Sequence, residues 1–389
     1  MAQDSKYRYN QLFEIILLTM LAVLLGTCSI SIVNEIISPI IRYIFILSML
    51  FMFFSSQKNS INRREFIYMF SIVLFGLGAL LMNGSSFAFI IHPIFIMFVV
   101  SFLIKVRLSK RFYNYLGTVA VGAWILSIIT SLRFTGAYID LLMSRTIVGK
   151  MNPNLVSFTL GATYWIVKEW IQRKDIGKQR KLFLIWGLSI STLVFMVRCR
   201  SRASLAAFVI AFAIDKILGK KLGSSKKLAY SMYWGSVLLG TLLPAVYVFI
   251  WKNTFFHNIN VLGKNIFTGR QTIWYNFFEY LEQIPRSFFV GTGYNTDFYI
   301  GGTFDLHNSY MQILAEFGIL VFLIYFLFLF ITLTKAYKFG RISENKRNFL
   351  MMGVFLLMAG YAEIFLISSK TSYCSIIAFG LLGTHETLE

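Results

Sequence analysis

The chain has 389 residues, of which 57% are hydrophobic and 14% charged, and its mean hydropathy is +0.67. So apolar a composition excludes an ordinary soluble domain and predicts an all-α polytopic membrane protein. The net charge of +20 then bears on membrane topology, and we expect no nucleic-acid partner. The three cysteines, Cys28, Cys199 and Cys374, are too widely spaced for a disulfide framework or a metal site and are interpreted as structural.

Apolar runs long enough to cross a bilayer follow one another along the chain. They lie near 11–33, 37–55, 66–82, 86–104, 113–133, 153–171, 182–199, 201–218, 229–251, 308–334, 348–368 and 370–384. Since a transmembrane helix needs about 20 apolar residues, they predict about 12 transmembrane helices in a single domain, 1–389. We expect the first run to be retained as a helix, because it lacks the short core and cleavage site of a secretory signal.

Lysine and arginine gather in one of the two sets of loops that these spans define. Most of the 37 cations lie near 6–8, 58–64, 105–111, 168–181, 216–227 and 335–347. Because cytoplasmic loops carry the positive excess, this distribution predicts that both termini are cytoplasmic. Active residues on the opposite loops would then face the exterior or the periplasm.

The segment 252–307 is the one long connection, and this topology places it outside the membrane as an external loop. Within it, "TGRQTIWYNFFEYLEQIP" predicts an amphipathic helix over about 269–284 that lies on the outer surface. Thr268 and Gln271 have the spacing of a capping box, and Pro285 stops the pattern. The apolar face carries Trp274, Phe277, Phe278, Leu281 and Ile284.

Three arginines stand close together in "MVRCRSRASLAA", at the external side of two predicted helices. Arg198, Arg200 and Arg202 violate the charge rule there, which makes simple contact with lipid head groups the weaker explanation. Guanidinium groups bind phosphate oxygens in pairs and stay charged at physiological pH, so the cluster is a candidate diphosphate site that needs no metal ion. Arg198 and Arg202 share a helix face if the second helix begins early.

A second polar group opens the predicted helix 308–334. Asn308, Gln312 and Glu316 recur every four residues and predict one polar stripe, with His307 at its mouth. His307 is suited to act as a base or to position a hydroxyl, and Asp305 or Glu316 is the reserve candidate. The alternative is a helix cap with hydrogen bonds between helices.

Further ionisable groups fall toward the external ends of the predicted spans. Arg42, Arg133 and Glu363 are candidates for a cationic substrate cavity, together with Asn308 and Gln312. Arg42 could equally extend to lipid head groups. The stretch "GTGYN", 291–295, lacks the third glycine and the setting of a phosphate loop, so a tight turn is expected.

Taken together, several short motifs resemble those of the O-antigen polymerase and O-antigen ligase family of bacterial membrane glycosyltransferases. They are "KMNPNLVSF", "RSRASLAAFV", "TGRQTIW", "GTGYN" and "HNSYMQILAEFGI", in this order over about 145–335. The resemblance implies a helical glycosyltransferase fold of the GT-C type. It also implies that Arg202, with Arg198 or Arg200, and Arg270 bind a donor diphosphate, and that His307 serves catalysis.

The resemblance further implies a multi-pass protein of the bacterial cytoplasmic membrane that joins oligosaccharide repeats carried on polyprenyl diphosphate, without a cofactor. The external loop lacks an extension after the histidine, which favours a polymerase over a ligase. A ligase or protein glycosylase with the same donor, and a lipid-linked oligosaccharide flippase, remain alternatives. The expected partners are the lipid-linked donor and acceptor, the bilayer, and chain-length regulator and flippase proteins.

Overall fold

The computed structural model describes residues 14–23, 25, 44, 63–83, 91–132, 152–253, 260–261, 264–265, 267, 269–293, 306–337, 340–367 and 371–386. Three candidate site residues, Arg42, Arg133 and Asp305, lie outside this part of the chain, as do Cys28 and nearly all of the predicted span 37–55. The described part is overwhelmingly helical, as the composition predicts.

The first half of the fold consists of helices of about the predicted lengths. They are α3 (Arg63–Asn83), α4 (Ile91–Leu103), α5 (Lys110–Ser131), α7 (Pro153–Arg173), α8 (Lys178–Arg198), α9 (Arg202–Ser224) and α10 (Lys226–Trp251). A further helix, Glu14–Val23, covers part of the first predicted span. Each of these helices falls on or overlaps an apolar run that the sequence marks as a span.

The second half is less regular. It contains α11 (Arg270–Gln283), α12 (Arg286–Val290), α13 (Ser309–Ala336), α14 (Glu344–Ala359), α15 (Ser372–Ser375), the π-helical turn η3 (Ile376–Gly380) and α16 (Leu381–Gly383). The described residues also contain four two-residue strands. β1 (Arg107–Leu108) pairs in parallel with β4 (His385–Glu386), and β2 (Asn260–Val261) pairs antiparallel with β3 (Lys264–Asn265).

The helices α5, α8, α10 and α13 are long and apolar enough to cross a membrane. Large apolar side chains on α8 and α10 are exposed, including Phe183 (79%) and Phe249 (78%). Apolar surface of this kind on a soluble protein would cause aggregation, whereas in a bilayer it contacts lipid tails. The chain is therefore a membrane protein, while the number of twelve spans and the orientation of the termini stay predictions.

The predicted span 348–368 differs from the structure. The run 348–368 predicts one helix to residue 368, but α14 ends at Ala359 and a turn containing Glu363 follows. Backbone hydrogen bonding explains the early end, because Ser309 N–H donates to Gly360 O at 2.8 Å and the Ser309 hydroxyl donates to Glu363 O. Tertiary contacts thus take over the hydrogen bonding that a longer helix would provide.

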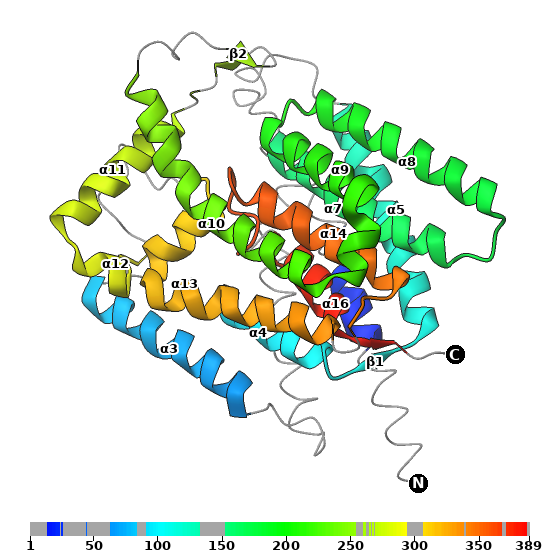
Figure 1. Ribbon diagram of the computed structural model, residues 1–389, viewed down its shortest axis with the longest axis horizontal. Coiled ribbons are helices and arrows are strands. Elements are labelled where there is room, and N and C mark those ends of the chain that lie inside the picture. Colours follow the sequence, from blue (N-terminus) through cyan, green and yellow to red (C-terminus); the bar gives the residue numbers. More distant parts are fainter. Residues whose placement is uncertain are drawn as a thin grey trace.

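Helix α14 occupies the centre of the molecule. It packs against α7 and α9 on one side and against α10 on another (Figure 1). Aromatic rings fill the space between α7, α9 and α14, where Phe158 stacks on Phe355 with centroids 5.6 Å apart and Tyr164 meets Phe208 edge to face at 5.0 Å. Gly161 lets α7 and α14 approach closely, because a Cβ there would lie 2.5 Å from the Phe355 ring. These three helices form a rigid frame.

Helix α13 is broken at Gly318, where φ is 76° and ψ is 175°. The break frees the carbonyls of Ala315 and Glu316, which accept hydrogen bonds from the N–H groups of Thr292 (2.6 Å) and Gly293 (3.3 Å). Residues 291–293 therefore form a tight backbone crossing against α13, whereas 294 and 295 lie outside the described residues and the expected turn stays a prediction. Within a membrane protein, such pairing is what allows a helix to be interrupted.

Gly318→Ala is expected to destabilise the protein. A Cβ would meet Phe289 O at 2.2 Å, and the left-handed backbone alone costs about 1–3 kcal/mol for a residue other than glycine. We expect a lower melting temperature in detergent than for Gly353→Ala, since a Cβ at Gly353 finds its nearest neighbour 3.6 Å away. Equal melting temperatures for the two variants would contradict this account of the crossing.

Candidate functional site

The centre of the candidate site is the carboxylate of Glu363 in the turn after α14. Its Oε1 accepts hydrogen bonds from Asn154 Nδ2 at 2.7 Å and from Arg270 Nη2 at 2.6 Å, and its Oε2 lies 3.2 Å from His307 Nδ1. The residue is only 6% exposed. We call these four residues the Glu363 cluster. One buried acid thus joins side chains that lie 56, 93 and 209 residues away in the sequence.

Local turn chemistry places two members of the Glu363 cluster. Asn154 follows Pro153, the first residue of α7, and its N–H is capped by the Asn152 side chain at 2.9 Å. Arg270 is the first residue of α11 and follows Gly269, which has φ 89° and provides the left-handed turn into the helix. The predicted Thr268 capping box is therefore corrected: Gly269 is the N-cap and makes no side-chain cap bond, because the helix begins one residue later.

The apolar face of α11 packs against the protein. Trp274 and Phe277 are buried in a cluster with Val248 of α10 and Met311 of α13. The indole N–H of Trp274 donates to Leu306 O at 2.6 Å. Packing against α10 and α13, rather than amphipathic contact with the outer membrane surface alone, thus fixes the helix that carries Arg270.

His307 has a left-handed backbone, with φ 50°. This conformation is unfavourable for residues other than glycine and persists where the surroundings impose it. Both neighbours are fixed: Leu306 N–H donates to Gln312 Oε1 at 2.8 Å, and Asn308 is fully buried. Strain of this kind is concentrated at functional sites, and here it directs the imidazole toward Glu363.

Asn308 is the N-cap of α13, the alternative that the sequence leaves open for it. Its Oδ1 accepts from the N–H groups of Tyr310 and Met311, both at 2.9 Å. Its Nδ2 donates to Gly240 O at 3.0 Å and to Tyr361 O at 2.8 Å. Asn308 therefore joins α13 to α10 and to the turn after α14, and positions the adjacent His307.

Gln312 and Glu316 continue the same stripe along α13, as the spacing predicts. Both are buried, and Gln312 Nε2 donates to Glu316 Oε1 at 2.7 Å. Glu316 lies about 10 Å beyond Ser309 along the axis of α13. In this structure Gln312 positions the backbone before His307, and the carboxylate that His307 Nδ1 contacts is that of Glu363.

The three clustered arginines diverge. Arg198 ends α8 and donates to Ser131 O at 3.2 Å and to Leu132 O at 3.1 Å, at the C-terminus of α5. Arg200 is exposed, with φ 52°. Arg202 begins α9, is half-buried, and interacts electrostatically with Arg270 and Tyr247. The expectation that Arg198 and Arg202 share one helix face is corrected, because the left-handed Arg200 separates the two helices.

Arg198→Ala is expected to alter activity by less than about threefold while lowering thermal stability. Its guanidinium satisfies the last carbonyls of α5, and a cation at a helix C-terminus contributes about 0.3–1 kcal/mol. Thermal unfolding and the rate of glycosyl transfer, measured side by side with Arg202→Ala, check this. A loss of activity as large as that of Arg202→Ala would mean that Arg198 also contacts substrate.

Sequence reasoning missed the role of Asn154. The motif "KMNPNLVSF" contains it, and the helix-opening Asn–Pro–Asn pattern is visible, but nothing local indicates a partner in the turn after α14. The sequence indicates Glu363 as a candidate site residue, but it does not indicate which residues Glu363 contacts. Cys199 and Cys374 are buried and form no disulfide within the described part of the chain, consistent with their structural interpretation.

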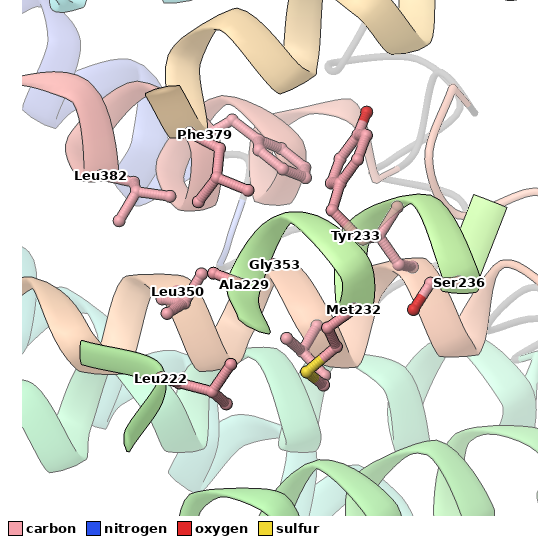
Figure 2. A pocket seen from close by; sticks show the side chains of 12 residues that line it. Leu222, Ala229, Met232, Tyr233, Ser236, Leu350, Gly353, Phe379 and Leu382 are labelled. Atoms are coloured by element: carbon pink, nitrogen blue, oxygen red, sulfur yellow. The ribbon is translucent and has the colours of Figure 1, made fainter. Parts of the chain in front are cut away.

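A separate apolar pocket lies between α10, α13, α14 and the segment from η3 to α16 (Figure 2). It is lined by Leu222, Ala229, Met232, Tyr233, Ser236, Leu333, Leu350, Gly353, Val354, Leu357, Phe379 and Leu382. The Tyr233 hydroxyl donates to Phe326 O at 2.6 Å. This lining has no charged side chain to neutralise a diphosphate, so we place the reaction site at the Glu363 cluster instead.

One family model matches a part of the chain. Residues 187–326 match the model of the O-antigen ligase family. The match contains Arg202, Arg270 and His307, whereas Asn154 and Glu363 lie outside it. No curated protein and no solved structure matches the chain.

Proposed function

We propose that this membrane protein, whose O-antigen ligase family match supports the ligase and polymerase family, is an oligosaccharide repeat-unit polymerase. It joins oligosaccharides carried on polyprenyl diphosphate at the external face of the bacterial cytoplasmic membrane. The observation that carries the proposal is the Glu363 cluster, in which one buried carboxylate holds both an arginine and a histidine.

Arg202 and Arg270 bind the donor diphosphate. Arg202 and Arg270 carry like charges that interact electrostatically, and a bound anion would reduce the repulsion between them. Paired guanidinium groups hold phosphate oxygens in a fixed geometry. Arg200, at the exposed junction of α8 and α9, is a further candidate for the outer phosphate, and Arg198 contributes through the position of that junction.

His307 accepts the proton of the acceptor hydroxyl. With Nδ1 directed at Glu363, Nε2 is the ring nitrogen that acts as base, and the side chain is 35% exposed, so a hydroxyl can reach it. Glu363 fixes the tautomer and stabilises the imidazolium that forms, as carboxylates do beside catalytic histidines. Glu363 is therefore a positioning residue for this base.

The reaction is a direct displacement at the anomeric carbon of the donor. The acceptor oxygen forms the new glycosidic bond while the bond to the diphosphate oxygen breaks, and polyprenyl diphosphate leaves with the electron pair. The acceptor proton passes to Nε2 of His307 and then to water. Arg202 and Arg270 stabilise the negative charge that develops on the leaving group. Attack from the opposite side predicts inversion of configuration.

We expect excess EDTA to leave the rate of transfer unchanged, because guanidinium groups supply the charge that a metal ion would otherwise bring. Initial rates of purified protein with and without the chelator, followed by readdition of Mg²⁺ or Mn²⁺, check this. Loss of activity that only a divalent cation restores would require a metal ion at the diphosphate.

Two alternatives keep specific support. A ligase or protein glycosylase would use the same cluster with another acceptor, and the family match includes the ligases. A flippase would be consistent with the interrupted helix α13, since transporters use broken helices at their binding sites. Here, however, hydrogen bonds from Thr292 and Gly293 occupy the carbonyls at the interruption, leaving them less suited to binding substrate.

The deciding experiment incubates purified protein with radiolabelled lipid-linked repeats in liposomes. A ladder of products lengthening by one repeat, lost in Arg202→Ala, is the expected result. A single transfer to an added lipid or protein acceptor without a ladder would favour the ligase. Repeats that cross the bilayer but never lengthen would identify a transporter and overturn the polymerase.

A further inference from the structure

A second group of buried polar side chains lies at the opposite end of the helices that carry the site. Lys168 Nζ contacts Asp215 Oδ2 at 2.6 Å, and the two side chains are 3% and 5% exposed. Arg347 Nε lies 3.6 Å from the other oxygen of Asp215. Asn348 Nδ2 donates to Glu169 Oε2 at 2.5 Å. We call these five residues the buried network.

The buried network joins the same three helices that end at the candidate site. Helix α7 carries Asn154 at its start and Lys168 near its end, and α9 carries Arg202 at its start and Asp215 further along. These pairs are about 20 Å apart along their helices. Helix α14 runs the other way, with the network's Arg347 and Asn348 in its first turns and Glu363 just beyond its end.

The space between the two ends is filled by aromatic and apolar side chains, including Phe158, Phe208 and Phe355. Apolar contacts of this kind stabilise the packing but discriminate poorly between registers one turn apart. Buried charge pairs discriminate strongly, because a shift of one helix would leave a charge buried without its partner. Within a rigidly packed frame, a register fixed at one end is also fixed at the other.

We propose that the buried network sets the register of α7, α9 and α14, and thereby positions Asn154, Arg202 and Glu363 against one another. Its members are positioning residues that never touch substrate. The functional consequence rests on the polymerase proposal, whereas the effect on register does not.

The test replaces the charged core of the network by apolar residues of similar size, in the triple variant Lys168→Met, Asp215→Leu and Arg347→Met. Since well-packed apolar residues often replace a buried ion-pair triad without loss of stability, this variant should fold. Register is read directly with cysteines at 154 and 204, in a background whose three native cysteines are serine, because Ser204 Oγ lies 3.5 Å from Asn154 O.

We expect the triple variant to keep its melting temperature but to form the 154–204 disulfide at least about fivefold more slowly. With native residues at 154 and 204, we expect turnover at saturating donor to fall about tenfold to hundredfold, since misplacement by 1 Å can cost that much. Wild-type rates in both measurements would overturn the proposal and make the network a stability device alone.

A second variant covers failure of the triple variant to fold. Asn348→Leu removes only the hydrogen bonds from Asn348 of α14 to Glu169 and Gln172 of α7, and its expected results are the same in direction. Slower cross-linking with unchanged turnover would support the role of the buried network in helix register and contradict its role in activity. If wild-type protein transfers no sugar at all, the polymerase proposal fails, while the cross-linking rates still decide the register.

Discussion

His307→Ala is expected to lower turnover about 10²- to 10⁴-fold, with donor affinity changed little. A loss of this size is typical when a general base is removed. Donor affinity is retained because Arg202 and Arg270 still hold the diphosphate. Initial rates over a range of donor concentrations, with purified protein and lipid-linked repeats, separate turnover from KM. Melting temperatures confirm that the variant is folded.

The control is Gln179→Ala, an exposed residue in the first turn of α8, which contributes no member of the Glu363 cluster. We expect this variant to stay within about threefold of the wild-type rate, as substitutions away from a site usually do. A His307→Ala enzyme that still made long products at the control rate would remove His307 from the chemistry and return the role of base to another group.

Glu363→Gln is expected to reduce turnover about 10²- to 10⁴-fold, although it changes only one atom of the side chain. An amide that donates to His307 Nδ1 forces the proton onto Nε2, which is then unable to act as base. It also leaves Arg270 without a buried anion. The measurement is the same kinetic assay, and a rise in donor KM on top of the loss of turnover would report the change at Arg270.

Glu363→Ala removes one partner of a buried ion pair, which typically destabilises a protein by about 3–5 kcal/mol, so its melting temperature should fall more than that of Glu363→Gln. Glu344→Gln, at the exposed start of α14, is the control. If Glu363→Gln turned over like Glu344→Gln, the hydrogen bond from His307 would have no catalytic role.

The variants together separate two functions at the candidate site, proton transfer and stabilisation of the leaving group. His307 variants affect the proton, Arg202 variants affect the leaving group, and Glu363 variants affect both, because the carboxylate contacts His307 and Arg270. Combining His307→Ala with Glu363→Gln should cost little more than either change alone, since groups that act as a unit are not additive.

Much of this site is visible in the sequence as separate motifs. Arg202 stands out because charged groups at the ends of apolar runs are costly unless they serve a purpose. His307 stands out because it precedes a polar stripe, and Arg270 enters only through the resemblance of its motif. The start of α13 follows from its capping residue Asn308, and the helix α11 follows from local periodicity. These features depend on neighbours within a few residues, which a single sequence contains.

The roles of Arg198 and Asn154 could not be assigned in this way. Arg198 stands two residues from Arg200, yet it binds carbonyls of α5, because a left-handed residue redirects the chain between α8 and α9. Asn154 precedes Glu363 by 209 residues, and the two meet only because α14 ends early and its following turn folds back over α7.

By itself, the sequence determined that this is a helical membrane protein, where most of its helices lie, and which motifs place charged residues beside apolar runs. These are properties of hydropathy, periodicity and residue type, which act locally. Only the tertiary structure decided that Glu363 binds Arg270, His307 and Asn154, and that the opposite ends of the same helices share a buried network. Such pairings depend on how distant helices pack, and no local pattern specifies that geometry.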